Sequence, residues 1–144
     1  MTKNIVVWVC LWCACCANAE ALIDQEQIAW RNAAKSALTI IGYRNDQVMT
    51  YGDNLSIPAE NALKQWGKIL PAQAVPAPGD DRISPPILRV NRFEKQGDEF
   101  EFEATKGVIG GDNHLRCGTT TRFRIKYVRG KGWRQVGPTW NRVC

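Results

Sequence analysis

Two stretches of alternating sequence decide the fold: Glu99-Phe100-Glu101-Phe102-Glu103-Ala104 and Arg122-Phe123-Arg124-Ile125-Lys126-Tyr127. In each stretch a charged side chain follows every apolar one, which is typical of a strand with one face on a core and one in water. Between them, Gly110-Gly111-Asp112-Asn113 is a turn signal. The two stretches therefore predict an antiparallel hairpin.

A turn between Asp112 and Asn113 satisfies both faces of this hairpin at once. It brings acidic side chains opposite basic ones on one face and apolar side chains together on the other. Such cross-strand pairs contribute about 0.2–1 kcal/mol each, so we interpret the charges as a structural ladder, not a catalytic or nucleic-acid site. The predicted facing pairs are Glu99 with Lys126, Glu101 with Arg124, Glu103 with Arg122, Phe100 with Ile125, and Phe102 with Phe123.

On either side of the hairpin, a two-residue hydrophobic period predicts a strand from Ile87 to Phe93 and a last strand from Trp133 to Cys144. Pro138 marks an edge or a bulge in the last strand. Turns are expected at Gln96-Gly97-Asp98 and at Gly130-Lys131. The C-terminal half is thus predicted to be a curled antiparallel sheet of about four strands.

The N-terminal half has helical periodicity. We expect helices over Asp24 to Ile41, with Gly42 as the stop, over Asn45 to Tyr51, and from Ser56 to Pro71. The apolar stripe of the first is Trp30, Ala33, Ala34, Ala37, Leu38 and Ile41, and that of the third is Leu63, Trp66, Ile69 and Leu70. The predicted fold class is α+β, with about three helices packed on the sheet.

Residues 71–86 hold five of the seven prolines and are interpreted as a stiff connector between the helical and strand halves. Residues 1–19 are typical of a secretory signal peptide: Lys3 precedes an apolar run, and Ala17-Asn18-Ala19 matches a cleavage site. The mature chain is then one domain, 20–144, that starts at Glu20. Lipidation of Cys15 or Cys16 is the alternative, and it would keep the protein on a membrane.

Removal of the signal leaves Cys117 and Cys144, and a cysteine pair in an exported protein is usually a disulfide. A two-residue turn at Gly130-Lys131 would also place these two cysteines opposite each other. The disulfide would contribute about 3 kcal/mol by closing a loop of about 28 residues.

No constellation for catalysis or cofactor binding is recognised. A zinc site needs four ligands, whereas the mature chain has two cysteines and only His114. None of its three serines lies in a nucleophile elbow, and Gly107-Val108-Ile109-Gly110-Gly111 lacks the Gly-Lys-Ser/Thr of a phosphate loop. We expect no metal, no cofactor and no catalytic residue.

Charge is unevenly placed. Residues 20–81 carry 5 Lys and Arg against 8 Asp and Glu, while residues 82–144 carry 13 against 6. When the charges of the predicted ladder are paired, a surplus of positive charge remains around one hairpin tip, at Arg129, Lys131 and Arg134. These three residues are the predicted partner-binding site.

The helical half also resembles a known family. Ala37-Leu38-Thr39, Tyr43-Arg44 and Leu55-Ser56-Ile57-Pro58-Ala59 are similar to the periplasmic domains of type IV secretion components of the DotI/IcmL/TraM kind. The layout resembles cystatin-like and nuclear-transport-factor-like rolls. This chain has no Gly-Trp after Pro58, where those domains carry one, and its Trp66 lies further on.

Together these features predict an exported, periplasmic or secreted, non-enzymatic domain that binds a protein, in a secretion or conjugation apparatus. Nucleic acid is not an expected partner. Two alternatives stay open: an exported inhibitor or immunity protein against a toxin or hydrolase, and a small secreted hydrolase that uses Glu101 or Glu103. The hydrolase requires a carboxylate that is unpaired and lies in a cleft.

Overall fold

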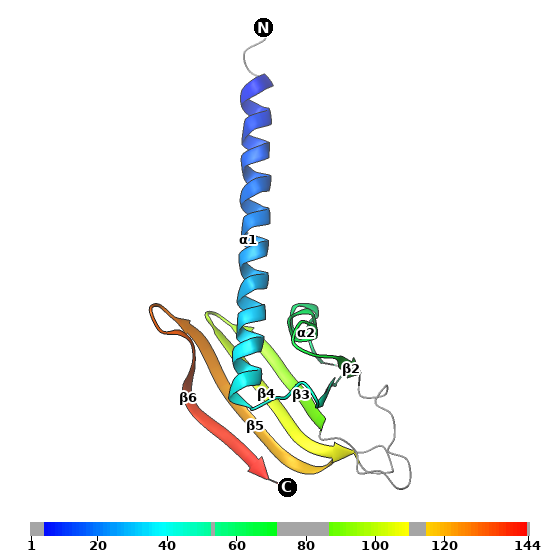
Figure 1. The fold of residues 1–144 in the computed structure, drawn as a ribbon. Coiled ribbons are helices and arrows are strands. Elements are labelled where there is room, and N and C mark those ends of the chain that lie inside the picture. Colours follow the sequence, from blue (N-terminus) through cyan, green and yellow to red (C-terminus); the bar gives the residue numbers. More distant parts are fainter. Residues whose placement is uncertain (1–4, 53, 72–86, 110–114, 144) are drawn as a thin grey trace.

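The computed structural model describes residues 5–52, 54–71, 87–109 and 115–143, with side chains from residue 21 onward except at 71, 108–109 and 115–117. These residues form an α+β fold with two helices and a six-stranded mixed sheet (Figure 1). In chain order the elements are α1 (Ile5–Ile40), β1 (Val48–Tyr51), α2 (Ile57–Lys64), β2 (Ile69–Pro71), β3 (Ile87–Gln96), β4 (Glu99–Ile109), β5 (Leu115–Val128) and β6 (Gly132–Val143).

The strand order is β2-β1-β3-β4-β5-β6, and β1 pairs in parallel with both β2 and β3. The remaining pairs are antiparallel. The prediction of about four antiparallel strands therefore missed β1 and β2, which have only four and three residues. Segments this short show no alternation that a sequence pattern could detect.

Helix α1 begins earlier than the predicted Asp24, because no proline or glycine interrupts the sequence from Ile5 to Ile40. Its C-terminal part packs across one face of the sheet, and its N-terminal part projects beyond the ends of the strands (Figure 1). The predicted cleavage site after Ala19 falls within this helix. In the described part of the chain, no helix is long and apolar enough to cross a membrane.

The predicted stop of α1 is confirmed. Gly42 has φ of 65°, and the Tyr43 N–H donates to the Leu38 carbonyl at 2.9 Å. The Gly42 N–H donates to the Thr39 carbonyl at 3.1 Å. This is the Schellman arrangement, in which a left-handed glycine satisfies the last free carbonyls of a helix.

The core lies between α1 and the sheet. The predicted stripe of α1 is confirmed from Trp30 to Leu38, since its five residues over that span are buried, and Ile41 packs at its edge. The Trp30 ring lies edge-on to Phe93 and Phe100, with centroids 5.0 and 4.9 Å apart. Aromatic pairs prefer this geometry, which fixes the helix over the middle of the sheet.

The second predicted helix, Asn45 to Tyr51, is wrong. This segment contains β1, whose β-branched and aromatic residues lie between β2 and β3. The third predicted helix is correct only from Ile57 to Lys64, because the chain turns at Trp66 and continues as β2. Strand pairing, with two neighbours for β1 and one for β2, outweighs the weak helical pattern of these segments.

The register of the β4–β5 hairpin is confirmed for all five predicted facing pairs, from Glu99 with Lys126 to Glu103 with Arg122. Its turn and His114 lie outside the described residues. The predicted turn at Gly97 is also present, with φ of 65°.

The predicted register of the β5–β6 hairpin is wrong. A loop of three residues, Arg129 to Lys131, joins the strands, so Val128 faces Gly132. An irregularity at Gly137-Pro138 then adds residues to β6, and Thr119 faces Val143, where the prediction placed Gly118. The turn-based derivation of the cysteine pairing therefore fails by one residue. The Cys117–Cys144 disulfide itself lies outside the described side chains and stays a prediction based on export.

Candidate functional site

The ladder of charges covers the sheet face that lies away from α1. Its strands face as predicted, and the predicted pair of Glu99 with Lys126 is present at 3.9 Å, but the two shorter ion pairs run diagonally to the register. Arg122 contacts Glu101 at 2.8 Å, and Arg124 contacts Glu99 at 3.0 Å. Long side chains reach such diagonal neighbours easily.

Glu101 is the most enclosed charge of the ladder, with its side chain 8% exposed. Arg92 of β3 contacts it at 2.9 Å from one side, and Arg122 of β5 at 2.8 Å from the other. Burial raises the pKa of Glu101, but hydrogen bonds from Arg122 and Arg92 outweigh burial and bring that pKa below its ordinary value. A carboxylate held in this way stays ionised and favours the ladder interpretation over a general acid.

Glu103 occupies the next position along β4. Its Oε1 accepts from Asn91 Nδ2 at 3.4 Å, and the same amide donates to Thr105 Oγ1 at 2.9 Å. Glu101 and Glu103 line a hollow of about 440 Å³ together with Trp140. The two residues of the hydrolase alternative therefore lie in one hollow, but each has polar partners.

The predicted partner-binding residues lie together at the β5–β6 end. Arg129, Lys131 and Arg134 are exposed, and no carboxylate of the described residues forms an ion pair with them. Arg134 Nε donates to the Lys131 carbonyl at 3.0 Å, which fixes the guanidinium against the turn. We call these three residues the basic tip.

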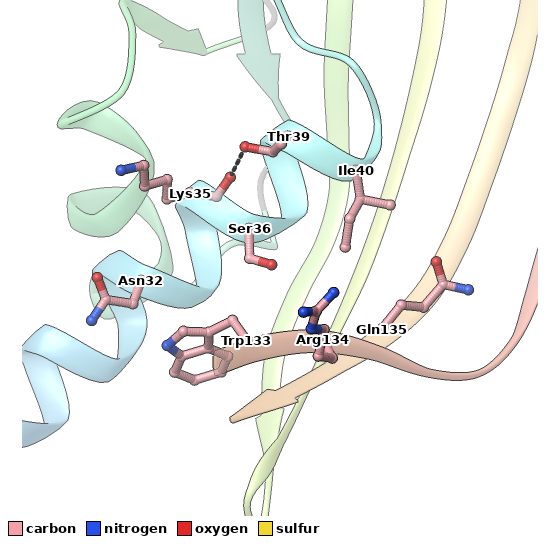
Figure 2. A pocket seen from close by; sticks show the side chains of 8 residues that line it. All are labelled: Asn32, Lys35, Ser36, Thr39, Ile40, Trp133, Arg134 and Gln135. Carbon is pink, nitrogen blue, oxygen red and sulfur yellow. Dashed lines mark hydrogen bonds between the residues drawn. The ribbon is translucent and has the colours of Figure 1, made fainter. Parts of the chain in front are cut away.

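A groove that the sequence did not indicate adjoins the basic tip. It has a volume of about 600 Å³ and lies between α1 and β6 (Figure 2). Ser36 and Ile40 point from α1 toward β6, while Arg134 points back toward the helix (Figure 2). The Gln135 amide points to the side, and its Nε2 donates to Thr139 Oγ1. The lining residues are Asn32, Lys35, Ser36, Thr39, Ile40, Trp133, Arg134 and Gln135, and none is acidic.

Lys35 belongs to the rim of the groove rather than its interior. Its ammonium group points away from Arg134 (Figure 2) and lies 5.2 Å from the centroid of the Trp66 ring. A cation over an aromatic face is favourable, and the Trp66 Nε1–H in turn donates to the Arg31 carbonyl at 3.2 Å. Arg134 is therefore the cation that faces the groove.

The hairpin that carries the basic tip has an unbalanced charge. Residues 115–143 contain eight Lys and Arg and no Asp or Glu. The Glu99 and Glu101 carboxylates of β4 pair with Arg122, Arg124 and Lys126. The positive potential of this end of the domain is therefore concentrated at the basic tip and along β6.

The apolar stripe of α1 could not indicate the groove, because the α1 residues that line the groove lie on the polar flank of the helix. Their neighbours on β6 are about 100 residues away in sequence. The signal that could have indicated the groove is the row of hydroxyl and amide side chains on α1 beside the buried stripe, namely Asn32, Ser36 and Thr39. Among the described residues, no three His, Cys, Asp or Glu side chains gather as metal ligands would.

Comparison with known protein families, characterised proteins and solved structures finds no match for this chain. The resemblance to type IV secretion components accordingly rests on the sequence alone. The function must be inferred from the basic tip, the groove and the ladder, which are the features with distinctive chemistry in the described part of the chain.

Proposed function

We propose that the domain is exported and acts as a non-enzymatic protein-binding module, as part of an envelope secretion or conjugation apparatus. The observation that carries this proposal is the basic tip: three exposed cations without a carboxylate partner among the described residues. They adjoin a groove without an acidic lining residue. This combination suits an acidic surface of a partner protein.

Protein is favoured over nucleic acid by the way the basic residues are distributed. A nucleic-acid surface presents cations in a continuous track along the phosphates. Here the cations along the middle of β5, Arg122, Arg124 and Lys126, are paired by Glu99 and Glu101. The basic tip gathers three exposed cations without an ion pair among the described residues in one compact patch, which matches a local acidic patch better than a long polyanion.

Cations at an exposed tip act mainly by steering a partner and by orienting it. Such charges raise the association rate, and salt screens their attraction at distances beyond the Debye length, which is about 8 Å at physiological ionic strength and about 3 Å at 1 M salt. We therefore expect binding through the basic tip to be strong at low salt and much weaker near 1 M salt.

The test begins with a photo-crosslinking amino acid in place of Lys131, in cells that export the protein, with the same substitution at Asn61 as the control. Asn61 lies on α2, in a groove between α2 and α1. A partner crosslinked from position 131 and not from position 61 supports the proposal. A soluble enzyme as that partner would favour the inhibitor or immunity function over the secretion apparatus.

A pair of matched variants then measures the charge effect on the purified partner. R129E/K131E and R31E/K68E each replace two exposed cations, but only the first pair belongs to the basic tip. We expect the first variant to lose about tenfold in affinity at low salt, roughly 1.4 kcal/mol, and the second to bind normally. Equal losses in both variants would show that the tip has no special role.

A further inference from the structure

We propose that the half of β6 at residues 133–136 accepts an extended acidic segment of the partner as an additional strand, whose side chains enter the groove beside α1. This inference rests on the proposed function and adds how the partner is held. In the described residues β6 is the last strand of the sheet and pairs only with β5. Half of its main-chain N–H and C=O groups therefore point away from β5 toward an open edge.

The two halves of this edge are not equally open. Natural edges are commonly blocked by prolines and bulges, and the irregularity at Gly137-Pro138 provides both. Pro138 has no N–H, and Gly137 has φ of 70°, so strand pairing cannot run through this point. Gly132 also has φ of 74° where the chain leaves the turn, so pairing can begin only after it. From Trp133 to Val136 the strand has neither a proline nor a bulge and lies next to the basic tip.

Charge selects the occupant of this edge. Two β6 edges that met in a dimer would bring together two strands that contain no Asp or Glu, each with its own Arg134. An acidic strand meets the opposite situation, because Arg129 and Lys131 lie at the turn end of the open half of the edge and Arg134 lies within it. A partner segment with Glu or Asp at alternate positions fits this edge, and a second copy of the chain does not.

The groove adds selection by side chains. In strand addition, main-chain hydrogen bonds supply affinity and pockets for alternate side chains supply specificity. Trp133 and Ile40 offer apolar surface, Ser36 and Gln135 offer hydrogen-bond partners, and Arg134 supplies the cation. The expected segment alternates small apolar residues with acidic ones over about five residues.

The probe for the test is an acetylated and amidated heptapeptide that alternates valine and glutamate. It is titrated against the full-length protein while amide hydrogen exchange is followed. We expect exchange to slow at least tenfold at residues 133–136 and to stay unchanged at β2, the opposite edge of the described sheet. The same peptide with lysine in place of glutamate is expected not to bind.

Backbone pairing is separated from simple charge attraction by N-methylation. Two versions of the heptapeptide carry methyl groups on alternate amides, one version on each set. Strand addition requires the two versions to differ at least tenfold in affinity, because only one set of amides faces β6. Equal affinities would overturn the strand-addition mechanism and would leave the basic tip as a charge-only surface.

The groove is tested by S36W, which fills it, with N61W as the matched change in the groove on the other flank of α1. We expect S36W to lose at least tenfold in peptide affinity and N61W to keep it. Preferred binding of anionic vesicles or of a single-stranded oligonucleotide over the peptide would refute the inference, as would a concentration-dependent dimer through β6. Loss of the partner in R129E/K131E with equal affinities of the two methylated peptides would refute strand addition while the proposed function stands.

Discussion

Neutralising Glu101 tests whether the charges on the outer sheet face hold the domain together. E101Q keeps the size of the side chain and removes its charge, so it makes no cavity. In the wild type this carboxylate lies between the guanidinium groups of Arg92 and Arg122, at 2.9 and 2.8 Å. The matched control is E103Q, because Glu103 lies on the same face and forms only a long hydrogen bond with Asn91 among the described residues.

The expected loss follows from these contacts. A hydrogen bond to a charged group contributes about 1.5–3 kcal/mol when it is well shielded from water. Both arginines are more than 40% exposed, so solvent screens each pair to about 1 kcal/mol. Because the glutamine oxygen still accepts one hydrogen bond, E101Q should lower the free energy of unfolding by about 1–2 kcal/mol. E103Q should lower it by less than about 0.5 kcal/mol.

The sign of the pH dependence is fixed by the lowered pKa of Glu101. A carboxylate with a lower pKa in the folded state stabilises the fold above its unfolded pKa of about 4.3. That stabilisation is lost as the pH falls through the folded-state value. The difference between wild type and E101Q should therefore be full at pH 7 and should shrink steadily below about pH 4.

Urea unfolding followed by tryptophan fluorescence measures these free energies at a series of pH values. At pH 7 we expect the unfolding midpoint of E101Q to fall by about 1 M urea. Two results would refute the reasoning: E101Q as stable as E103Q at pH 7, or a wild-type advantage that does not change between pH 7 and pH 3. Either would show that the ladder is a solvated surface that contributes little.

Three further predictions concern the core, the sheet and the cysteines. W30A removes the ring that packs between two phenylalanines of the sheet and should cost about 3–5 kcal/mol in chemical unfolding. In G118A the added Cβ would overlap a backbone carbonyl of β4, so the free energy of unfolding should fall by about 2–3 kcal/mol. The control G97A, at an open turn, should lower it by only about 1 kcal/mol. Equal losses in the two variants would contradict this steric explanation. Mass spectrometry of alkylated protein from its native compartment should show Cys117 and Cys144 oxidised, with a loss of about 3 kcal/mol on reduction, and two free thiols would disprove the pairing.

Sequence alone determined the elements whose two faces differ strongly along a long segment. The Trp30 to Leu38 stripe of α1 and the alternation in β4 and β5 each distinguish a buried face from a wet one. A slip of one residue would bury charge, so the register of Glu99 with Lys126 could be predicted from the pattern. The same holds for Gly42, whose left-handed conformation is what a helix stop requires.

Tertiary structure decided the rest. Strand β1 could be recognised only from its neighbours, because four residues carry too little pattern. The second partner of Glu101, Arg92, could not be predicted either, because the register places Glu94 opposite Glu101 and Arg92 reaches the carboxylate diagonally. The groove, too, exists only because the polar flank of α1 crosses an edge strand about 100 residues away in sequence. Local periodicity encodes which side chains are buried, whereas a site built from distant segments depends on how those buried faces dock.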